Sequence, residues 1–368
     1  AMNRFLLILV MFQIVAAEGA DFEAVDQAAS GLLDAGAAGI AMAVINAEGQ
    51  VWSKAQGFSN LDAGTEMSTG TLMNIASISK TLVAVSLMML EEQGMLDLDR
   101  DINTYLPFAF SHPVFPDEKI TVRQLLTHTS AIVDRESIYF SDSSYFYGGD
   151  NPILLGDFLR AYLDPGGKFY DRANFATQVP GSAYAYSNVG AGLAGYIVER
   201  VSGKPLNQFS RERIFTPLKM KHSGWMLAEI DSSRHAKLYQ WNGQTHEPVE
   251  WYGLATWPDG GLRTSVDELS RYLVAMMNGG EWQGSRIMQR ETVERMFAPQ
   301  FAAGMRLAGV QEEQGHRQAM GWGYQQQESG HDLLGHGGGD PGVATWAYFF
   351  PATLTGVILF VNTSSGDE

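Results

Sequence analysis

The sequence predicts an α+β fold in which segments from both ends of the chain build an antiparallel sheet and a helical part lies between them. Strand patterns occur within residues 39–55 and again within residues 320–362. Between 77 and 280, apolar residues have mostly helical spacing. A sheet built from distant segments with a helical insertion leaves a cleft between the two parts, which is a favoured place for a ligand site.

The chain of 368 residues is long enough for a sizeable core, because 45% of it is hydrophobic and 18% is charged. We expect a single domain over residues 18–368. Its sheet part comprises about residues 18–70 and 285–368, and its helical part comprises about residues 71–284.

The individual elements follow from local patterns, taken in chain order. A helix is expected over residues 21–35, followed by strands at 39–45 and 51–55 that are joined by a turn at 46–49. In the helical part, capping residues mark the helix starts: Thr121 before residues 122–126, Ser187 or Asn188 before residues 189–201, and Ser265 with Glu268 as a capping box. The last strands are expected at residues 320–325, 333–336, 343–350 and 354–362.

Composition excludes several classes of partner. The net charge of −16 opposes binding to nucleic acid phosphates and to anionic lipid headgroups. The chain has no cysteine, so disulfides, thiolate zinc sites and cysteine-linked lipid anchors are excluded. The histidines and aspartates within residues 316–340 lack the helical spacing of a zinc hydrolase, and no metal or other cofactor is expected.

Residues 1–17 have the pattern of a signal peptide, with a short basic start, an apolar stretch at 5–12 and small residues at 15–17. The apolar stretch is well short of the roughly 20 residues that span a bilayer, so we expect no permanent transmembrane helix. Cleavage is expected after about Ala17. The predicted location is therefore the periplasm or the outside of the cell.

Ser77 and Lys80 are one helical turn apart, directly before the apolar run at residues 81–90. A serine hydroxyl is inert near neutral pH unless a proton acceptor or a charge lies within hydrogen-bond reach. Burial beneath the serine would make Lys80 a candidate proton partner for a Ser77 nucleophile. Taken alone, the same two residues also suit a helix cap and a solvated lysine.

Two short motifs further along complete the pattern. Residues 186–188 form the single Tyr-x-Asn of the chain, and residues 336–339 read His-Gly-Gly-Gly. Two rivals are weaker: Tyr184 lacks the following asparagine, and the His-x-Gly at residues 222–224 is not followed by a glycine run leading into strands. Glycines after His336 remove side chains where a substrate would approach an edge strand, although they also suit a hairpin turn.

The order of Ser-x-x-Lys, Tyr-x-Asn and His-x-Gly resembles the penicillin-recognising serine hydrolases, which include class C β-lactamases, DD-peptidases, D-aminopeptidases and related esterases. The resemblance covers roughly residues 22–363 and implies the α+β fold of β-lactamases and penicillin-binding proteins. It extends to connecting segments that look like family signposts, at residues 94–99, 125–130, 186–190 and 215–220.

The resemblance implies roles for the catalytic residues Ser77, Lys80 and Tyr186. Ser77 would attack a carbonyl carbon and form an acyl-enzyme. Tyr186 would act as general base for that attack and then as acid toward the leaving group. A tyrosine ordinarily ionises near pH 10, so this role requires a nearby cation such as Lys80.

The resemblance also implies a set of substrate-binding residues: Asn188, His336, Gly338 and Gly339. Asn188 would donate to the substrate carbonyl and hold Lys80. The backbone amides of Ser77 and Gly339 would form an oxyanion hole. The substrate would be a small ester, amide or peptide.

His336 occupies the place where many relatives carry a lysine or a tryptophan. An imidazole is mostly neutral above pH 7, so attraction to a substrate carboxylate should be weaker than with lysine. We therefore expect ester or small-amide hydrolysis in preference to efficient β-lactam hydrolysis. A DD-peptidase or penicillin-binding protein, a β-lactamase, and a catalytically silent relative that binds peptidoglycan or a partner are the alternatives. The lack of a Ser-Asp-Asn motif disfavours class A β-lactamases.

Two further segments have open assignments. Residues 134–180 are rich in aromatic side chains and could wall the substrate cleft or form a surface loop packed by its own rings. Relatives usually continue past the last strand into a terminal helix, whereas only residues 363–368 follow here. We expect the sheet face to be covered by residues 5–15 or by a second copy of the chain in a homodimer.

Overall fold

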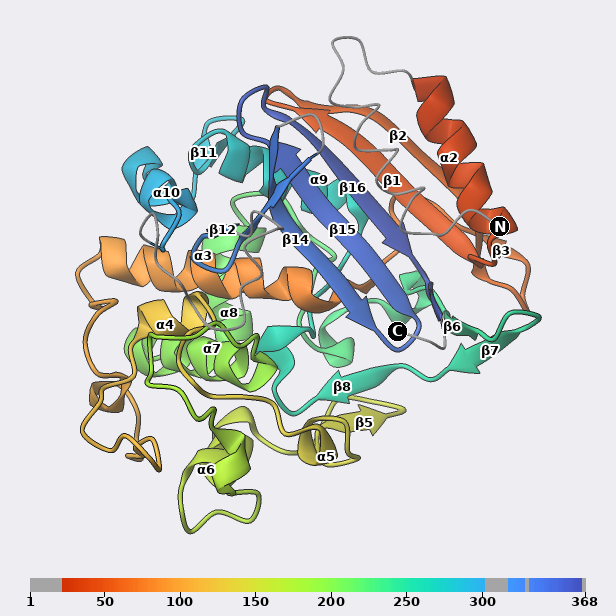
Figure 1. The fold of residues 1–368 in the computed structure, drawn as a ribbon. Helices are drawn as coiled ribbons and strands as arrows, with labels where there is room; N and C mark the ends of the chain where they lie inside the picture. Colours follow the sequence, from red (N-terminus) through yellow and green to blue (C-terminus); the bar gives the residue numbers. More distant parts are fainter. Residues whose placement is uncertain (1–21, 302–316, 328–330, 366–368) are drawn as a thin grey trace.

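The computed structural model describes residues 22–301, 317–327 and 331–365. Figure 1 shows a large sheet with one helix along its side and a group of helices below it. The predicted signal peptide and the suggested cover at residues 5–15 lie outside the described residues. Within the described ranges, no helix has the length and apolar character needed to cross a membrane.

The large sheet has eight strands in the order β12-β13-β14-β15-β16-β1-β2-β3, and every neighbouring pair is antiparallel. Its strands are β1 (Gly39–Asn46), β2 (Gly49–Asn60), β3 (Thr65–Glu66), β12 (Arg317–Gln318), β13 (Gly323–Gln326), β14 (Asp332–Asp340), β15 (Val343–Phe350) and β16 (Thr355–Val361). β1 pairs with β16, so strands from the two ends of the chain meet inside the sheet. The predicted α+β fold is confirmed.

The helices of the described part of the chain are α2 (Phe22–Asp34), α3 (Ser79–Glu92), α4 (Val122–Leu126), α5 (Glu136–Tyr139), α6 (Leu155–Leu163), α7 (Asn188–Ser202), α8 (Leu206–Ser210), α9 (Val266–Met277) and α10 (Arg290–Phe297). α3 is buried from Ser79 to Leu90 and contacts α7, α8 and α10. A helix that is apolar all round belongs in a core. The residues at the start of α3 are therefore placed inside the molecule.

The two faces of the sheet pack against different helices because side chains alternate along each strand. Ile40 and Met42 of β1 lie in an apolar cluster with α2, whereas Ala41 and Ala43 belong to the main core. α9 packs against β1, β2 and β16. The predicted boundaries between a sheet part and a helical part stay a prediction, and α9, inside the range 71–284, contacts the sheet.

Smaller sheets join the layers in the described part of the chain. They pair β4 (Met73–Asn74) with β9 (Arg263–Thr264), β5 (Tyr145–Tyr147) with β8 (Tyr252–Leu254), β10 (Glu281–Trp282) with β11 (Ser285–Arg286), and β6 (Leu238–Trp241) with both β7 (His246–Val249) and β17 (Thr363–Ser365). The β4–β9 pair places Asn74 opposite Arg263. This pairing ties the segment before Ser77 to a distant segment of the chain.

Capping hydrogen bonds show where the predicted helices begin. α4 begins with the predicted cap at Thr121, and Ser187 rather than Asn188 caps α7. Ser265 accepts a hydrogen bond from the Glu268 N–H at the start of α9. The reciprocal half of the predicted capping box does not form, because the Glu268 carboxylate accepts hydrogen bonds from a neighbouring loop.

Candidate active site

Ser77 lies in the short 3₁₀ turn η1 (Ala76–Ile78) that leads into α3. Asn74 Oδ1 accepts a hydrogen bond from the Ala76 N–H at 2.7 Å, and Ser79 Oγ accepts one from the Leu262 N–H at 3.1 Å. Ala76 has a positive φ of 47°, which strains a residue other than glycine and persists where the surroundings enforce it. Ser77 is half-buried whereas its neighbours Ala76 and Ile78 are buried, so the side chain of Ser77 is the one that the turn exposes.

Lys80 lies one helical turn after Ser77 and is only 4% exposed. Its Nζ donates to Ser77 Oγ at 2.9 Å and to the carbonyl oxygen of Asp259 at 2.7 Å. The same Nζ lies 5.0 Å from the centre of the Tyr186 ring. The structure thus brings the three residues that the sequence pattern singled out around one buried amine.

Tyr186 lies just before α7 and is 38% exposed. The His128 ring packs against it with ring centres 4.3 Å apart. His128 Nδ1 accepts a hydrogen bond from the Ser187 N–H at 3.2 Å, and the His128 carbonyl oxygen accepts one from the Ala185 N–H at 2.8 Å. His128 therefore holds the backbone on both sides of Tyr186.

The first turn of α7 is bound by the carboxylate of Asp134. This carboxylate accepts hydrogen bonds from the Asn188 N–H at 2.8 Å, the Val189 N–H at 2.9 Å and the Ser187 hydroxyl at 3.2 Å. The first N–H groups of a helix lack partners inside the helix, and the helix dipole favours a negative charge there. Asp134 thus fixes the direction in which α7 leaves the Tyr186 segment.

The expected contact between Asn188 and Lys80 is wrong for the described residues. There, both hydrogen bonds of Lys80 go elsewhere, to Ser77 and to the backbone of Asp259. Asn188 lies at the first position of α7, two residues after Tyr186. A backbone carbonyl oxygen has taken the holding role that was expected of the amide side chain.

The glycine run of β14 lies beside the η1 turn that carries Ser77. β13 pairs only with the first part of β14, so residues 336–340 pair with β15 alone in the described part of the chain. A Cβ at Gly338 would lie 2.5 Å from the Ile75 carbonyl oxygen, which excludes any side chain there. Thr345 of β15 donates to that same oxygen at 2.9 Å. Beside Gly339 a Cβ would meet nothing within 4 Å, so the strand has open space at this point.

His336 projects half-buried from the same strand, with its ring centre 6.3 Å from that of Tyr186. Its Nδ1 donates to the Gly337 carbonyl oxygen at 2.5 Å. Burial, and then the positive charge of Lys80, lower the pKa of His336 to about 4. The imidazole is therefore neutral at pH 7 and adds no positive charge beside Lys80.

The two rival motifs make contacts within the core of the protein. Tyr184 packs edge-on against His128 with ring centres 5.8 Å apart, and burial raises the pKa of Tyr184. In the His-x-Gly at residues 222–224, Ser223 is fully buried and donates to Glu268 at 2.6 Å. These contacts link segments of the core and leave His336 as the His-x-Gly beside Lys80.

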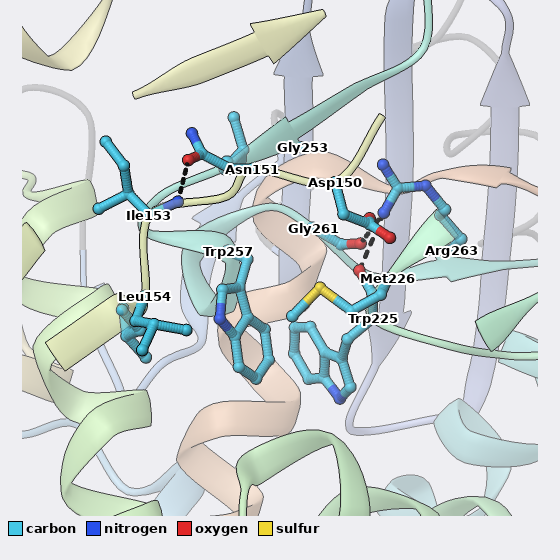
Figure 2. A pocket seen from close by; sticks show the side chains of 12 residues that line it. Asp150, Asn151, Ile153, Leu154, Trp225, Met226, Gly253, Trp257, Gly261 and Arg263 are labelled. Atoms are coloured by element: carbon cyan, nitrogen blue, oxygen red, sulfur yellow. Dashed lines mark hydrogen bonds between the residues drawn. The ribbon is translucent and has the colours of Figure 1, made fainter. Parts of the chain in front are cut away.

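The carbonyl that holds Lys80 belongs to the turn η7 (Trp257–Asp259), which borders the pocket of about 90 Å³ in Figure 2. The rings of Trp257 and Trp225 meet there edge to face, with centres 5.4 Å apart. Arg263 Nη1 donates to the carbonyl oxygens of Gly261 at 2.8 Å and Trp225 at 2.9 Å. These contacts brace the chain that follows Asp259.

Part of the aromatic segment at residues 134–180 reaches the site. Tyr139 donates to the Asp259 carboxyl group at 3.2 Å, and Tyr145 donates to Asp340 Oδ1 at 2.6 Å. Phe140 is 65% exposed and stacks on Tyr145. The segment therefore packs partly on its own rings and also contacts Asp259 and Asp340. That it walls the substrate cleft stays a prediction.

Four residues that shape the site were not predicted: His128, Asp134, Asp259 and Asp340. His128 lies in the segment 125–130 that looked like a family signpost, which was a signal without a role. The other three act through tertiary contacts that leave no local pattern. In the described residues, no group of three or more His, Asp or Glu side chains is arranged to hold a metal ion.

The fold and the grouping of a serine, a lysine and a tyrosine define the class of the penicillin-recognising proteins. The family model for Beta-lactamase matches residues 23–368, and the chain belongs to this family.

Comparisons with individual proteins agree with this assignment. The chain is 25% identical over 353 residues to N-acetylmuramyl-L-alanine amidase of Bacillus subtilis, covering 82% of this chain and 75% of that protein. It is 26% identical to the putative penicillin-binding protein PbpX of Bacillus subtilis, covering 73% of this chain but only 60% of that longer protein. The solved structure of D-amino acid amidase from Ochrobactrum anthropi has a TM-score of 0.72 and 23% identity, covering 93% of this chain and 92% of that one, and shows the shared fold.

Proposed function

We propose that the chain is a serine hydrolase that cleaves an ester or a small amide through an acyl-enzyme on Ser77. The position of the Lys80 amine carries this proposal. It is 4% exposed, donates to Ser77 Oγ at 2.9 Å and lies 5.0 Å from the centre of the Tyr186 ring. Membership of the Beta-lactamase family, with relatives named as amidases, supports hydrolysis as the class of reaction.

The contacts of Lys80 support a division of roles in acylation. An ammonium group has only donors, so while it donates to Ser77 the serine proton needs another acceptor. Tyr186 is the candidate in its phenolate form. Ser77 Oγ forms a bond to the substrate carbonyl carbon, its proton passes to Tyr186, and the carbonyl electron pair moves onto the oxygen.

The tetrahedral intermediate then collapses to the acyl-enzyme, and Tyr186 loses the proton that it took from Ser77. The bond from the carbonyl carbon to the leaving group breaks, and Tyr186 returns its proton to the leaving oxygen or nitrogen. The oxyanion is assigned to the backbone amides of Ser77 and Gly339, where each donor is typically worth about 3 to 4 kcal/mol of transition-state stabilisation. In deacylation water takes the place of Ser77, and its proton follows the same route.

The charge around Lys80 supports an ester or small amide as the substrate. Penicillins and peptide C-termini carry a carboxylate that a second cation would attract. His336 has a pKa of about 4 and so is neutral at pH 7, which leaves this attraction weak. The preference would be contradicted by a kcat/KM for cephalosporins as high as that for short p-nitrophenyl esters.

A fluorophosphonate probe tests the nucleophile directly. We expect labelling of the wild-type protein, none in Ser77→Ala, and unchanged labelling in Ser86→Ala. Ser86 is the control because it lies in α3, the helix that follows the η1 turn of Ser77, is fully buried and donates to the Leu82 carbonyl oxygen. Intact-mass analysis should locate the adduct on Ser77.

Other outcomes would favour the alternatives. Labelling that penicillin blocks would favour a DD-peptidase or penicillin-binding protein. No labelling of folded wild-type protein would favour a relative that binds peptidoglycan or a partner without catalysis.

A further inference from the structure

Two carboxyl groups lie beside Lys80 that the proposed reaction does not use. Asp259 ends the turn η7 and is 1% exposed, and its backbone carbonyl oxygen accepts from Lys80 Nζ. Asp340 ends β14, the strand that carries His336 and the glycine run. A carboxylate is rarely buried without a partner, because losing its hydration costs several kcal/mol or more.

Both carboxyl groups accept hydrogen bonds from hydroxyl groups. Asp259 Oδ2 accepts from Thr256 Oγ1 at 2.6 Å and from Tyr139 at 3.2 Å. Asp340 Oδ1 accepts from Tyr145 at 2.6 Å. The rings of Tyr139 and Tyr145 pack edge to face with centres 5.9 Å apart. The aromatic segment therefore connects the two acids.

The two acids and the η1 turn, which carries the Ser77 nucleophile, come together around Gly260. We call η1 the nucleophile turn. A Cβ at Gly260 would lie 3.5 Å from Asp340 Oδ2 and 3.8 Å from the carbonyl carbon of Ala76, the residue before Ser77. The end of β14, the turn that holds Lys80 and the nucleophile turn thus come together there. A change of charge on either acid would act on all three segments.

We propose that Asp259 and Asp340 are positioning residues of the hydrolase, whose negative charge keeps the Lys80 ammonium group at the Ser77 hydroxyl. This inference rests on the proposed function and adds the pH range in which that site works. When the acids take up protons, the charge that attracts the ammonium group is lost and acylation slows.

The surroundings of the two carboxyl groups bring their pKa values close to neutral pH, where a change in their charge would affect the activity. Burial raises the pKa of Asp259 to about 7 and that of Asp340 to about 6, and the positive charge of Lys80 opposes both shifts. Asp134, Asp340, Tyr139 and Tyr145 are the other charged or titratable groups that face Asp259. The groups that face Asp340 are Arg263, Asp259 and the tyrosines 139, 145, 147 and 252. His336 also faces Lys80 but titrates lower, near pH 4.

The first test compares two tyrosines of β5. Tyr145→Phe removes one hydrogen-bond donor to ionised Asp340, which raises the pKa of that carboxyl group. We expect the acid limb of the pH profile for kcat/KM to move upward by about one pH unit. Tyr147→Phe is the matched control, because Tyr147 lies two residues along the same strand and is 45% exposed. Profiles of the two variants that superimpose would overturn the role of Asp340.

The second test removes one charge and keeps its shape. Asp259→Asn leaves an oxygen to accept from Thr256 and Tyr139 but cannot ionise. We expect kcat/KM at pH 8 to fall by about 10-fold, and the fall in rate between pH 8 and pH 6 to become shallower. Thermal unfolding would show that the variant is folded. Wild-type rates and an unchanged profile in Asp259→Asn would overturn the role of Asp259.

Labelling separates failure of this inference from failure of the proposed function. If the fluorophosphonate labels Ser77 in the wild type and in both variants with one common pH profile, the hydrolase proposal stands and the positioning role is wrong. If the folded wild type is not labelled at any pH, both proposals are wrong.

Discussion

The Lys80 side and the Tyr186 side of the candidate active site are held in different ways. Lys80 is 4% exposed and starts a helix that is buried on every face, so packing of the core sets its position. Tyr186 is 38% exposed, and its place depends on hydrogen bonds that His128 and Asp134 make to the residues around it. Substitution of Lys80 should therefore remove most of the activity, whereas substitutions around Tyr186 should lower the activity by differing amounts.

The largest effect is expected for Lys80→Met, which removes the amine and keeps most of the side-chain volume. We expect kcat/KM for a p-nitrophenyl ester to fall by about 10³-fold or more, because the nucleophile loses its charged partner. Lys54→Met is the control, since Lys54 lies in a half-exposed ion pair with Asp26. A loss below about 10-fold would show that core packing, and not the amine, is what this position contributes.

A smaller but still large effect is expected for Tyr186→Phe. Loss of a general acid–base group typically costs about 10²- to 10⁴-fold in rate. Tyr184→Phe removes a neighbouring phenol that also contacts the His128 ring, and should leave kcat/KM within a few-fold of the wild type. Equal losses in the two variants would contradict a role in proton transfer that belongs to the Tyr186 hydroxyl and not to that of Tyr184.

Asp134→Asn should have a moderate effect on both stability and rate. The amide keeps the shape of the cap at α7 but loses the charge that three donors share. We expect the free energy of unfolding in urea to fall by about 1 kcal/mol. We also expect kcat/KM to fall by about 10-fold through displacement of Tyr186. Asp157→Asn, in the first turn of α6, is the control. Lower stability with unchanged kcat/KM would show that α7 does not position Tyr186.

The smallest effect is expected for His336→Gln between pH 6 and pH 8. The pKa of His336 is lowered to about 4, so the ring is already neutral over this range and a neutral amide changes no charge. We expect the shape of the pH profile for kcat/KM to stay the same. Disappearance of the acid limb in this variant would assign that limb to His336 and not to the acids beside Lys80.

The fold was predictable because its signals are local. Strand segments at both ends, a buried helix after Ser77 and caps at Thr121 and Ser187 each follow from a few neighbouring residues. β14 was predicted to end at residue 336 but continues to Asp340. Its glycines have little intrinsic preference for strands, and pairing with β15 holds them extended.

The grouping of residues at the candidate site was predictable only where a short motif marks the residues in the sequence. Ser77, Lys80 and Tyr186 carry such motifs and are brought together. The holder of Lys80 is a backbone carbonyl oxygen, which any residue at position 259 could supply, so sequence offered no signal for it. The expected holder, Asn188, failed for the same reason, because distances across the fold decide which acceptor is nearest.

The buried carboxyl group of Asp259 has opposite effects on the stability of the fold and on the activity of the site. A carboxyl group whose pKa rises from 3.8 when unfolded to about 7 when folded strengthens the fold fully below about pH 4, and this strengthening is lost as the pH climbs to about 7. Asp259→Asn should therefore raise the free energy of unfolding at pH 8 by about 2 to 4 kcal/mol, measurable in urea. In mild acid, protonation of Asp259 would make the protein more stable but less active, and activity would return at neutral pH.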